Sequence, residues 1–167
     1  EINTTSNLPL GSGLSSSSAL SNAVVTATAS LIADNFCLQP PNDFELINLA
    51  IDASLEAKVT ITGAFDDASA SYFGGVTVTD NTKRQILLQD EIPDEDVLVF
   101  MPDKSSLSGE SDVGRMKLLA PLVEIAFEQA LHKDFYEALT LNGLLYGTAL
   151  GFNNNIAFEA LNAGAKA

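Results

Sequence analysis

The sequence predicts an α+β domain in which short strands and amphipathic helices are mixed and a run of helices follows. Segments in which apolar and polar residues alternate are short, and they lie among longer segments with apolar residues at helical spacing. From residue 113 onward the chain carries helical patterns alone. Grouping of helices at one end of the sequence favours an α+β fold over a regular doubly wound parallel sheet.

The first part of the chain predicts a weak strand, a loop and a long helix. Residues 1–7 alternate in polarity, which predicts a strand. Residues 16–33 contain no Gly or Pro and are apolar on all sides, so we expect a helix that is buried on most of its surface. Pro40 and Pro41 then block regular hydrogen bonding, so a connection follows the helix.

A second helix is predicted over residues 42–57. Asn42 is the expected N-cap, and Glu45 stands three residues later, as in a capping box. The apolar residues of this segment recur at helical spacing and predict its buried face. They are Phe44, Ile47, Ala50 or Ile51, and Leu55.

The next segments predict a hairpin and a further strand. Residues 76–79 and 85–89 are rich in strand-forming residues, and residues 80–82 form the turn between them. The acidic residues around Pro93, within 90–96, predict a solvated loop because they lack a regular metal-ligand spacing. Residues 97–101 predict another strand.

The last part of the chain predicts a loop and a helical group. Residues 102–111 are polar and rich in Gly and Ser, which is typical of a mobile loop. Residues 113–131, 134–150 and 154–163 each carry helical periodicity.

Composition limits the classes of function. Hydrophobic residues make up 46% of the 167 residues, which is ample for a packed core. The net charge is −14, because 22 acidic residues face eight basic ones, and this disfavours nucleic-acid and anionic-membrane partners. Cys37 is the single cysteine, so no internal disulfide forms and a reducing, cytoplasmic location is expected. No signal peptide or apolar run of about 20 residues is visible.

The loop before the first long helix has the composition of an anion site. Gly11 and Gly13 permit a positive φ and close approach of a ligand. The serines at 15–18 can cap the helix start with their hydroxyls. Free N–H groups and the helix dipole at such a start attract phosphate. A turn followed by an ordinary helix cap is the alternative interpretation.

Three common loop motifs do not fit these residues. A Walker A loop ends in Gly-Lys-Ser/Thr, and the first Lys of this chain is Lys58. A dinucleotide fingerprint would have Gly or Ala in place of Ser16 and an acidic residue at the end of the next strand. A nucleophile elbow needs G-x-S-x-G, and Ser17 stands where its second Gly belongs.

The spacing of the loop resembles that of a known superfamily. Pro9-x-x-x-Gly13-Leu14-x-Ser16-Ser17-x-Ala19 is similar to the P-x-x-x-G-L-G-S-S-A phosphate loop of the galactokinase, homoserine kinase, mevalonate kinase and phosphomevalonate kinase (GHMP) superfamily. Ser15 replaces the third glycine, and the variant SGLSSSSA resembles the archaeal-type shikimate kinases. The resemblance implies a set of ATP-binding residues. They are Pro9, Leu10, Gly11, Ser12, Gly13, Leu14, Ser15, Ser16, Ser17, Ser18 and Ala19.

A second segment carries the same resemblance. Residues 62–75 match T-G-A-[FY]-D-D-A-x-A-S-Y-[FY]-G-G of the archaeal-type shikimate kinases throughout. The match implies that Asp66 is the catalytic aspartate, which would accept a hydrogen bond from the acceptor hydroxyl and take up its proton late. A helix cap is the alternative for Asp66. Asp67 either perturbs Asp66 by like-charge repulsion or caps the following helix, and we favour the cap.

The resemblance also implies a magnesium site. Mevalonate-kinase relatives hold Mg²⁺ with a Glu and a loop Ser, and Glu56 with Ser16 or Ser17 would correspond here. Mg²⁺ needs few protein ligands because it keeps phosphate oxygens and waters. An ordinary surface acid is the alternative for Glu56.

Three further residues are candidates to bind the substrate whose hydroxyl accepts the phosphate. Thr62 and Gly63 lie at the start of the turn that leads to Asp66 and Asp67. Arg115 could hold the carboxylate of shikimate in a bidentate fork. A helix salt bridge is the alternative for Arg115, and neighbouring Lys117 shares both interpretations.

As a whole, the resemblance implies a two-part architecture and an ATP-dependent kinase. Residues 1–92 would belong to the N-terminal ATP-binding part, which is similar to ribosomal protein S5 domain 2, and residues 93–167 would begin a ferredoxin-like C-terminal part. We expect an internal fragment of a longer enzyme that is weakly active or inactive alone.

The expected reaction is ATP + shikimate giving ADP + shikimate 3-phosphate, with Mg²⁺, in aromatic amino-acid and chorismate synthesis. Homoserine kinase is the alternative within the superfamily, and a non-catalytic binding module on the same fold is the alternative from another class. The oligomeric state is left open.

Overall fold

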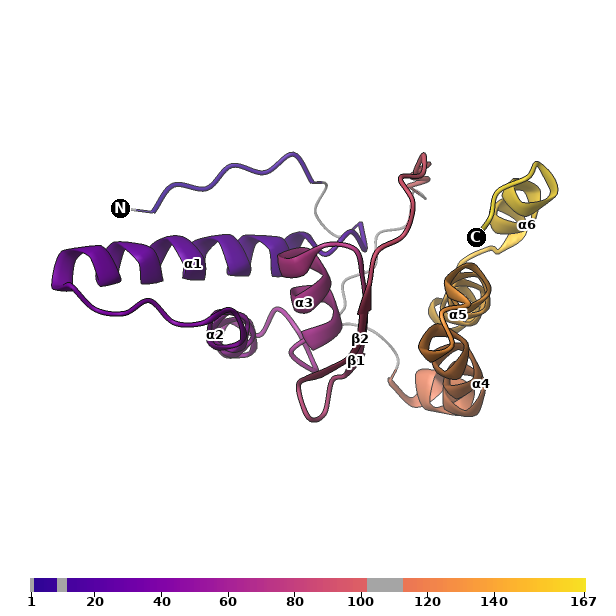
Figure 1. The fold of residues 1–167 in the computed structure, drawn as a ribbon. Helices are drawn as coiled ribbons and strands as arrows, with labels where there is room; N and C mark the ends of the chain where they lie inside the picture. The colour runs from indigo at the N-terminus through magenta and orange to yellow at the C-terminus, as the bar shows by residue number, and fades with distance from the viewer. Residues whose placement is uncertain (1, 9–11, 102–112) are drawn as a thin grey trace. The chain divides into compact units, whose positions relative to one another are not determined.

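The computed structural model describes residues 2–8, 12–101 and 113–167, and it divides into two compact units, Glu1–Gly109 and Glu110–Ala167 (Figure 1). The first unit contains α1 (Ser16–Phe36), α2 (Asp43–Glu56), α3 (Phe65–Phe73), β1 (Val76–Asp80) and β2 (Gln85–Asp90). The second contains α4 (Val113–Leu131), α5 (Phe135–Leu150) and α6 (Asn155–Asn162). The α+β class is as predicted, with mostly helices and a small two-stranded sheet.

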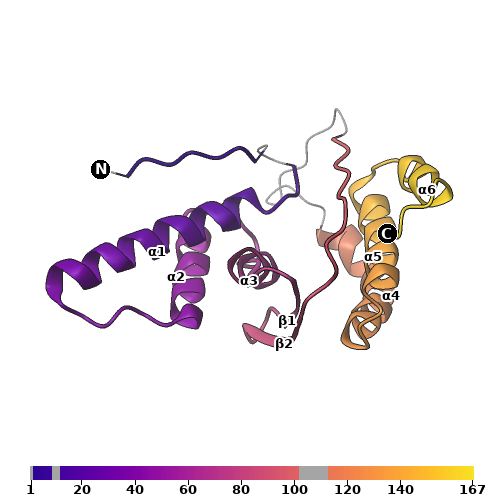
Figure 2. The same cartoon turned by 45° about the horizontal axis from the view of Figure 1, so that its top comes forward.

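A small apolar core holds α2, α3 and the hairpin together. Ile47 and Ile51 of α2 pack against Phe65 and Ala68 of α3, and all four side chains are almost fully buried. Figures 1 and 2 show α3 between the hairpin and the pair α1–α2. Burying an Ile or Phe side chain contributes about 1.5–3 kcal/mol. Because Phe65 directly precedes Asp66, this burial fixes where the aspartate turn lies.

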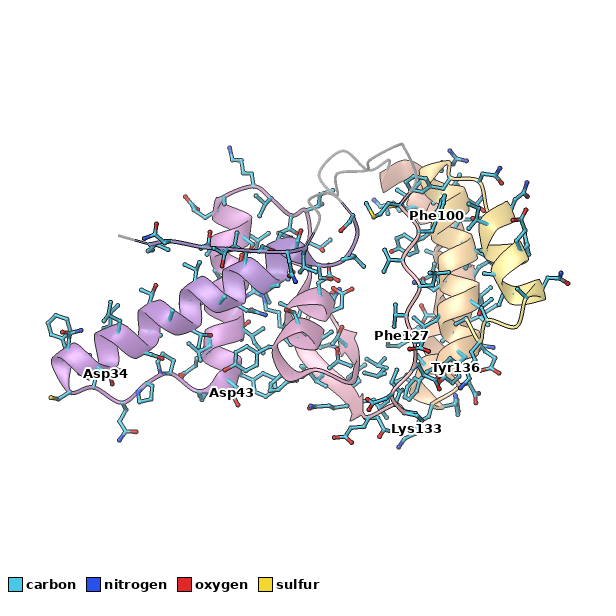
Figure 3. All side chains as sticks on the ribbon, turned by 90° about the horizontal axis from the view of Figure 1, so that it is seen from above. Asp34, Asp43, Phe100, Phe127, Lys133 and Tyr136 are labelled. Carbon is cyan, nitrogen blue, oxygen red and sulfur yellow. The ribbon has the colours of Figure 1, made fainter. Side chains whose placement is uncertain are left out.

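The predicted capping box at the start of α2 is confirmed. Asn42 Oδ1 accepts a hydrogen bond from the Glu45 N–H at 3.0 Å, and Glu45 Oε2 accepts one from the Asn42 N–H at 2.8 Å. Figure 3 shows Asp34 near the end of α1 and Asp43 at the start of α2, on either side of the connection between these helices.

The predicted hairpin is also confirmed. β1 and β2 pair antiparallel, with Val78 opposite Leu88 and Thr79 opposite Ile86, so the register shifts between Val78 and Thr79. A bulge of this kind leaves one residue of β2 unpaired and increases the local twist. At the turn, Asp80 accepts hydrogen bonds from both the backbone N–H of Lys83, at 3.0 Å, and its Nζ, at 2.8 Å.

Two predicted strands are wrong. Residues 2–7 and 97–101 have no strand pairing in the structure. Val97 and Leu98 are 83% and 94% exposed. Strand-forming residues favour a strand because their side chains pack well on the surface of a sheet. Without a neighbouring strand, they do not stabilise the extended conformation. The loop predicted over residues 102–111 lies outside the described residues.

The expectation that the first long helix is buried on most of its surface is wrong as well. Only Ser18, Asn22 and Ala33 of α1 are buried, and Leu31 is 63% exposed. α1 contacts α2 and α3. An all-round apolar composition leads to burial only on the sides where other elements pack.

The second unit is a helical hairpin with a short third helix. α4 and α5 pack against each other around small buried residues, Ala126, Ala138 and Ala149. Asn154 Nδ2 donates to the Leu144 carbonyl at 3.0 Å and so ties the start of α6 to α5. Figure 3 labels Lys133 and Tyr136 of this unit. Among the helices that the structure describes, none is long and apolar enough to cross a membrane.

Replacing Asn42 tests the capping box. Asn42→Ala should lower the free energy of unfolding by about 1 kcal/mol, because it removes the acceptor for the Glu45 N–H. Asn42→Asp keeps an equivalent acceptor and should stay within about 0.5 kcal/mol of the parent. Urea unfolding followed by circular dichroism measures both, and equal losses in the two variants would contradict the cap.

Candidate functional site

The start of α1 is shaped by a serine in the left-handed conformation. Ser15 is the N-cap residue with φ 53°, and Gly13 two residues earlier has φ 75°. The Ser15 hydroxyl makes no capping bond to the helix. The prediction that it caps is therefore wrong for Ser15, whose side chain points to another part of the chain.

That side chain contacts the aspartate turn. Ser15 Oγ donates a hydrogen bond to Asp67 Oδ1 at 2.8 Å, across 52 residues of sequence. The left-handed conformation costs a non-glycine residue about 1–2 kcal/mol. A hydrogen bond to a charged group contributes about 1.5–3 kcal/mol, which is enough to offset this cost. The contact therefore gives a physical reason why Ser is tolerated where the related loops have Gly.

A second hydrogen bond joins the same two helices. Asn22, about two turns further along α1, donates from Nδ2 to the backbone carbonyl of Ala68 at 2.9 Å in a buried setting. Ser15 directly precedes Ser16, and Asp67 directly follows Asp66. The serine loop (residues 12–19) and the aspartate turn (residues 62–67) therefore meet directly.

Asp66 lies in the first turn of α3 with an exposed side chain. The N-cap of α3 is Ala64, in the left-handed conformation with φ 48°. The predicted cap by Asp67 and the alternative cap by Asp66 are therefore both wrong, because both residues lie inside the helix. Asp66 instead pairs with Asn81 of the hairpin turn: its N–H donates to Asn81 Oδ1 at 3.1 Å, and Asn81 Nδ2 donates to Asp66 Oδ1 at 2.9 Å.

The two neighbouring carboxylates have different surroundings. Partial burial raises the pKa of Asp67 above its ordinary value, and the nearby charge of Asp66 acts in the same direction. The hydrogen bond from Ser15 opposes both by favouring the charged form. Both residues are exposed to solvent, but the Asp67 carboxylate contacts the loop, whereas the Asp66 carboxylate contacts Asn81 through one oxygen.

The candidate metal ligands are placed less closely. Glu56 is the last residue of α2 and is exposed, and no hydrogen bond joins it to Ser16 or Ser17. Ser54 of α2 contacts Ser21 of α1, with 2.8 Å between their hydroxyl oxygens. Two helical residues turn by about 200°, so Glu56 lies on the face of α2 away from that contact.

The donor chemistry nevertheless suits magnesium. A carboxylate and serine hydroxyls are hard oxygen ligands, and Mg²⁺ takes few of them. No cluster of three or more His, Cys, Asp or Glu side chains occurs among the residues with described positions. Such a cluster is not required when phosphate oxygens and waters complete the coordination.

The other predicted site residues fall into three groups. Thr62 and Gly63 shape the turn before Asp66: Thr62 Oγ1 accepts from the Ala64 N–H at 3.3 Å, and a Cβ on Gly63 would lie 2.7 Å from Ile51 Cγ2. Arg115 lies in the first turn of α4, in the second unit. Pro9, Leu10 and Gly11 lie outside the described residues.

The remaining loop positions differ in exposure. Gly13, Leu14 and Ser17 are exposed. Ser12, Ser16 and Ala19 are half-buried, and Ser18 is buried. Ser12 Oγ accepts a hydrogen bond from the Leu14 N–H at 3.3 Å. The burial of Ser18 makes it the member of the serine run least accessible to a ligand.

Asn81 was not among the predicted site residues, because residues 80–82 were predicted only to form a turn. One pattern could have singled it out. Thr77, Thr79 and Asn81 alternate along β1 and its turn, and alternate residues of a strand share a face. That face meets α3, since Thr77 Oγ1 lies 3.3 Å from Ser69 Oγ and Asn81 contacts Asp66.

The raised pKa of Asp67 gives a testable pH dependence. The folded protein holds the Asp67 proton more tightly than the unfolded chain does, so protonated Asp67 favours the folded state. This contribution to the free energy of unfolding is fully present below the ordinary Asp pKa of 3.8 and is lost as pH rises through the raised pKa of the folded state. Asp67→Asn stays neutral and still accepts from Ser15. Its free energy of unfolding, relative to the parent, should therefore increase as pH rises from about 3 to 7.

Urea unfolding at several pH values measures this difference. Asp34→Asn is a matched control, because Asp34 is an exposed aspartate near the far end of α1. A difference that stays flat with pH for Asp67→Asn, or changes equally for Asp34→Asn, would refute the assignment.

Comparison with known proteins gives consistent results. The family model described as GHMP kinases N terminal domain matches residues 1–75. Shikimate kinase of Methanobrevibacter smithii is 61% identical over 162 residues, which cover 97% of this chain and 56% of that protein. Shikimate kinase of Methanothermobacter thermautotrophicus is 57% identical over 164 residues, covering 98% of this chain and 57% of that protein.

A more distant relative shows the same pattern. Shikimate kinase of Pyrococcus furiosus is 40% identical over 165 residues, covering 99% of this chain and 58% of that protein. No solved structure matches. The chain spans about half the length of the curated relatives it matches. The serine loop and the aspartate turn both lie within the matched segment, and residues 1–75 carry the N-terminal domain of the GHMP kinases.

Proposed function

We propose that this chain carries the phosphate loop and the catalytic aspartate of an ATP-dependent shikimate kinase. The observation that supports this most is the 2.8 Å hydrogen bond from Ser15 to Asp67, because it brings the anion-binding helix start next to the exposed carboxylate of Asp66. The curated relatives are named shikimate kinases, and both motifs lie in the segments they share with this chain.

In the proposed reaction, the acceptor hydroxyl oxygen forms a bond to the γ-phosphorus of ATP. The bond from that phosphorus to the bridging oxygen of ADP breaks, so ADP leaves with its electron pair. The N–H groups at the start of α1 and the hydroxyls of Ser16 and Ser17 would hold the phosphates. Such positioning and charge stabilisation supply most of the catalysis in phosphoryl transfer.

Asp66 would orient the acceptor and take its proton. Asn81 occupies Oδ1 of the carboxylate, so Oδ2 is the oxygen left to accept a hydrogen bond from the hydroxyl. A carboxylate is a weak base for an alcohol, and the proton therefore transfers late, as the new oxygen–phosphorus bond forms.

Glu56 with Ser16 or Ser17 would hold Mg²⁺, which neutralises the charge of the triphosphate when bound. Glu56 lies on the face of α2 away from the Ser21 contact, so Ser16 and Ser17 of the loop are the ligands that the structure supports better. Thr62, Gly63 and Arg115 would contact the acceptor substrate.

The proposal extends to the organisation of the protein. In this proposal, residues 1–92 belong to the N-terminal ATP-binding part, and residues 93–167 belong to the C-terminal part. The substrate is a small molecule rather than a nucleic acid or a membrane, and the enzyme acts in the cytoplasm, in aromatic amino-acid synthesis.

Asp66→Asn tests the catalytic role. In the full-length protein this variant should lower kcat at least about 100-fold, because the amide cannot accept the hydroxyl proton, while KM for ATP changes little. The control is Asp34→Asn, whose residue lies about 28 Å along α1 from the loop and should leave kcat unchanged. Unaltered turnover in Asp66→Asn would remove Asp66 from the mechanism.

An acceptor panel tests the substrate. ADP release is measured with shikimate, with homoserine and with no acceptor. Turnover with shikimate alone supports the proposal. Turnover with homoserine would identify the other kinase activity, and ATP binding without turnover on either acceptor would identify a binding module.

A further inference from the structure

The side chain of Asn81 contacts Asp66 through two hydrogen bonds. Its Oδ1 accepts from the Asp66 backbone N–H, and its Nδ2 donates to the Asp66 carboxylate, at 3.1 and 2.9 Å. A backbone N–H can only donate and a carboxylate accepts, so these two partners leave one orientation for the amide. Both the position of the aspartate's backbone and the rotation of its carboxylate are therefore set by one side chain.

Asn81 is itself held in place by the hairpin. Thr79 Oγ1 donates to Asn81 Oδ1 at 2.8 Å, from the position two residues earlier on the same strand face. Asp80 closes the turn through its two hydrogen bonds from Lys83. The change of register between Val78 and Thr79 lies directly beside this group, and bulges often redirect side chains near active sites.

We propose that Asn81 is a positioning residue of the phosphoryl-transfer site, with Thr79 as its support. The proposal rests on the proposed function. Asn81 holds Oδ1 of Asp66 and so presents Oδ2 to the acceptor hydroxyl in a fixed direction. Without Asn81, the exposed Asp66 side chain at the start of α3 turns among its rotamers, and the carboxylate is aligned with the hydroxyl for only part of the time.

Steady-state kinetics with ATP and shikimate test this in the full-length protein. Asn81→Ala should lower kcat about 10- to 100-fold and leave KM for ATP within about twofold, because misalignment affects the transition state rather than nucleotide binding. Thr79→Val, which keeps the shape and removes the hydroxyl, should lower kcat by a smaller factor, and Thr79→Ser should restore it. Thr82→Ala is the matched control, an exposed residue of the same turn, and should leave kcat unchanged.

A double-mutant cycle separates positioning from general structural support. In an Asp66→Ala background, adding Asn81→Ala should cause no further loss of single-turnover rate, since Asn81 acts through Asp66. Circular dichroism and urea unfolding of each variant give the folded fraction, by which the rates are corrected. If Asn81→Ala does not fold, the Thr79 pair carries the same test.

Each outcome has a defined meaning. A folded Asn81→Ala or Thr79→Val with parental kcat overturns the positioning role, and so does a multiplicative loss in the double mutant. Should Asp66→Ala keep its turnover, or should no acceptor be phosphorylated, the proposed function fails and this proposal fails with it. Loss in Asp66→Ala together with full rates in Asn81→Ala contradicts the positioning role alone.

Discussion

The hydrogen bond between Ser15 and Asp67 is the contact on which the proposed site depends. It joins a loop at the start of one helix to a turn at the start of another, across 52 residues. Each half is unremarkable alone, because a helix N-terminus is a weak anion site and an exposed aspartate is common. In the proposed function, their contact brings phosphate-binding groups and a carboxylate together, which is the arrangement that phosphoryl transfer requires.

The small core behind the site makes this contact possible. Phe65 is buried between α2 and the hairpin, so the residue after it must emerge at the surface of the core. The buried bond from Asn22 to Ala68 fixes the spacing of α1 and α3. The hairpin adds a third direction of support, because Asn81 reaches back to the same turn. Helix α2, helix α1 and the hairpin turn thus all contact the first turn of α3.

Local chemistry made much of this predictable from the sequence. The capping box at Asn42 and the hairpin depend on neighbouring residues, and both are confirmed. The predicted strand at 97–101 failed because its composition needs a partner strand, and the predicted burial of α1 failed because burial depends on what packs around a helix. Asn81 was missed because its partner lies 15 residues away. The alternation of Thr77, Thr79 and Asn81 places them on one face, but it does not say which element that face meets.

One titration tests the central claim that the serine loop and the aspartate turn form a single site. The ¹⁵N-labelled full-length protein is titrated with ATP and Mg²⁺ while the backbone amide signals of residues 12–19 and 65–68 are followed. If the two segments line one site, both groups of signals shift and give the same dissociation constant. Saturation of the loop signals with no change at residues 65–68 would contradict the account.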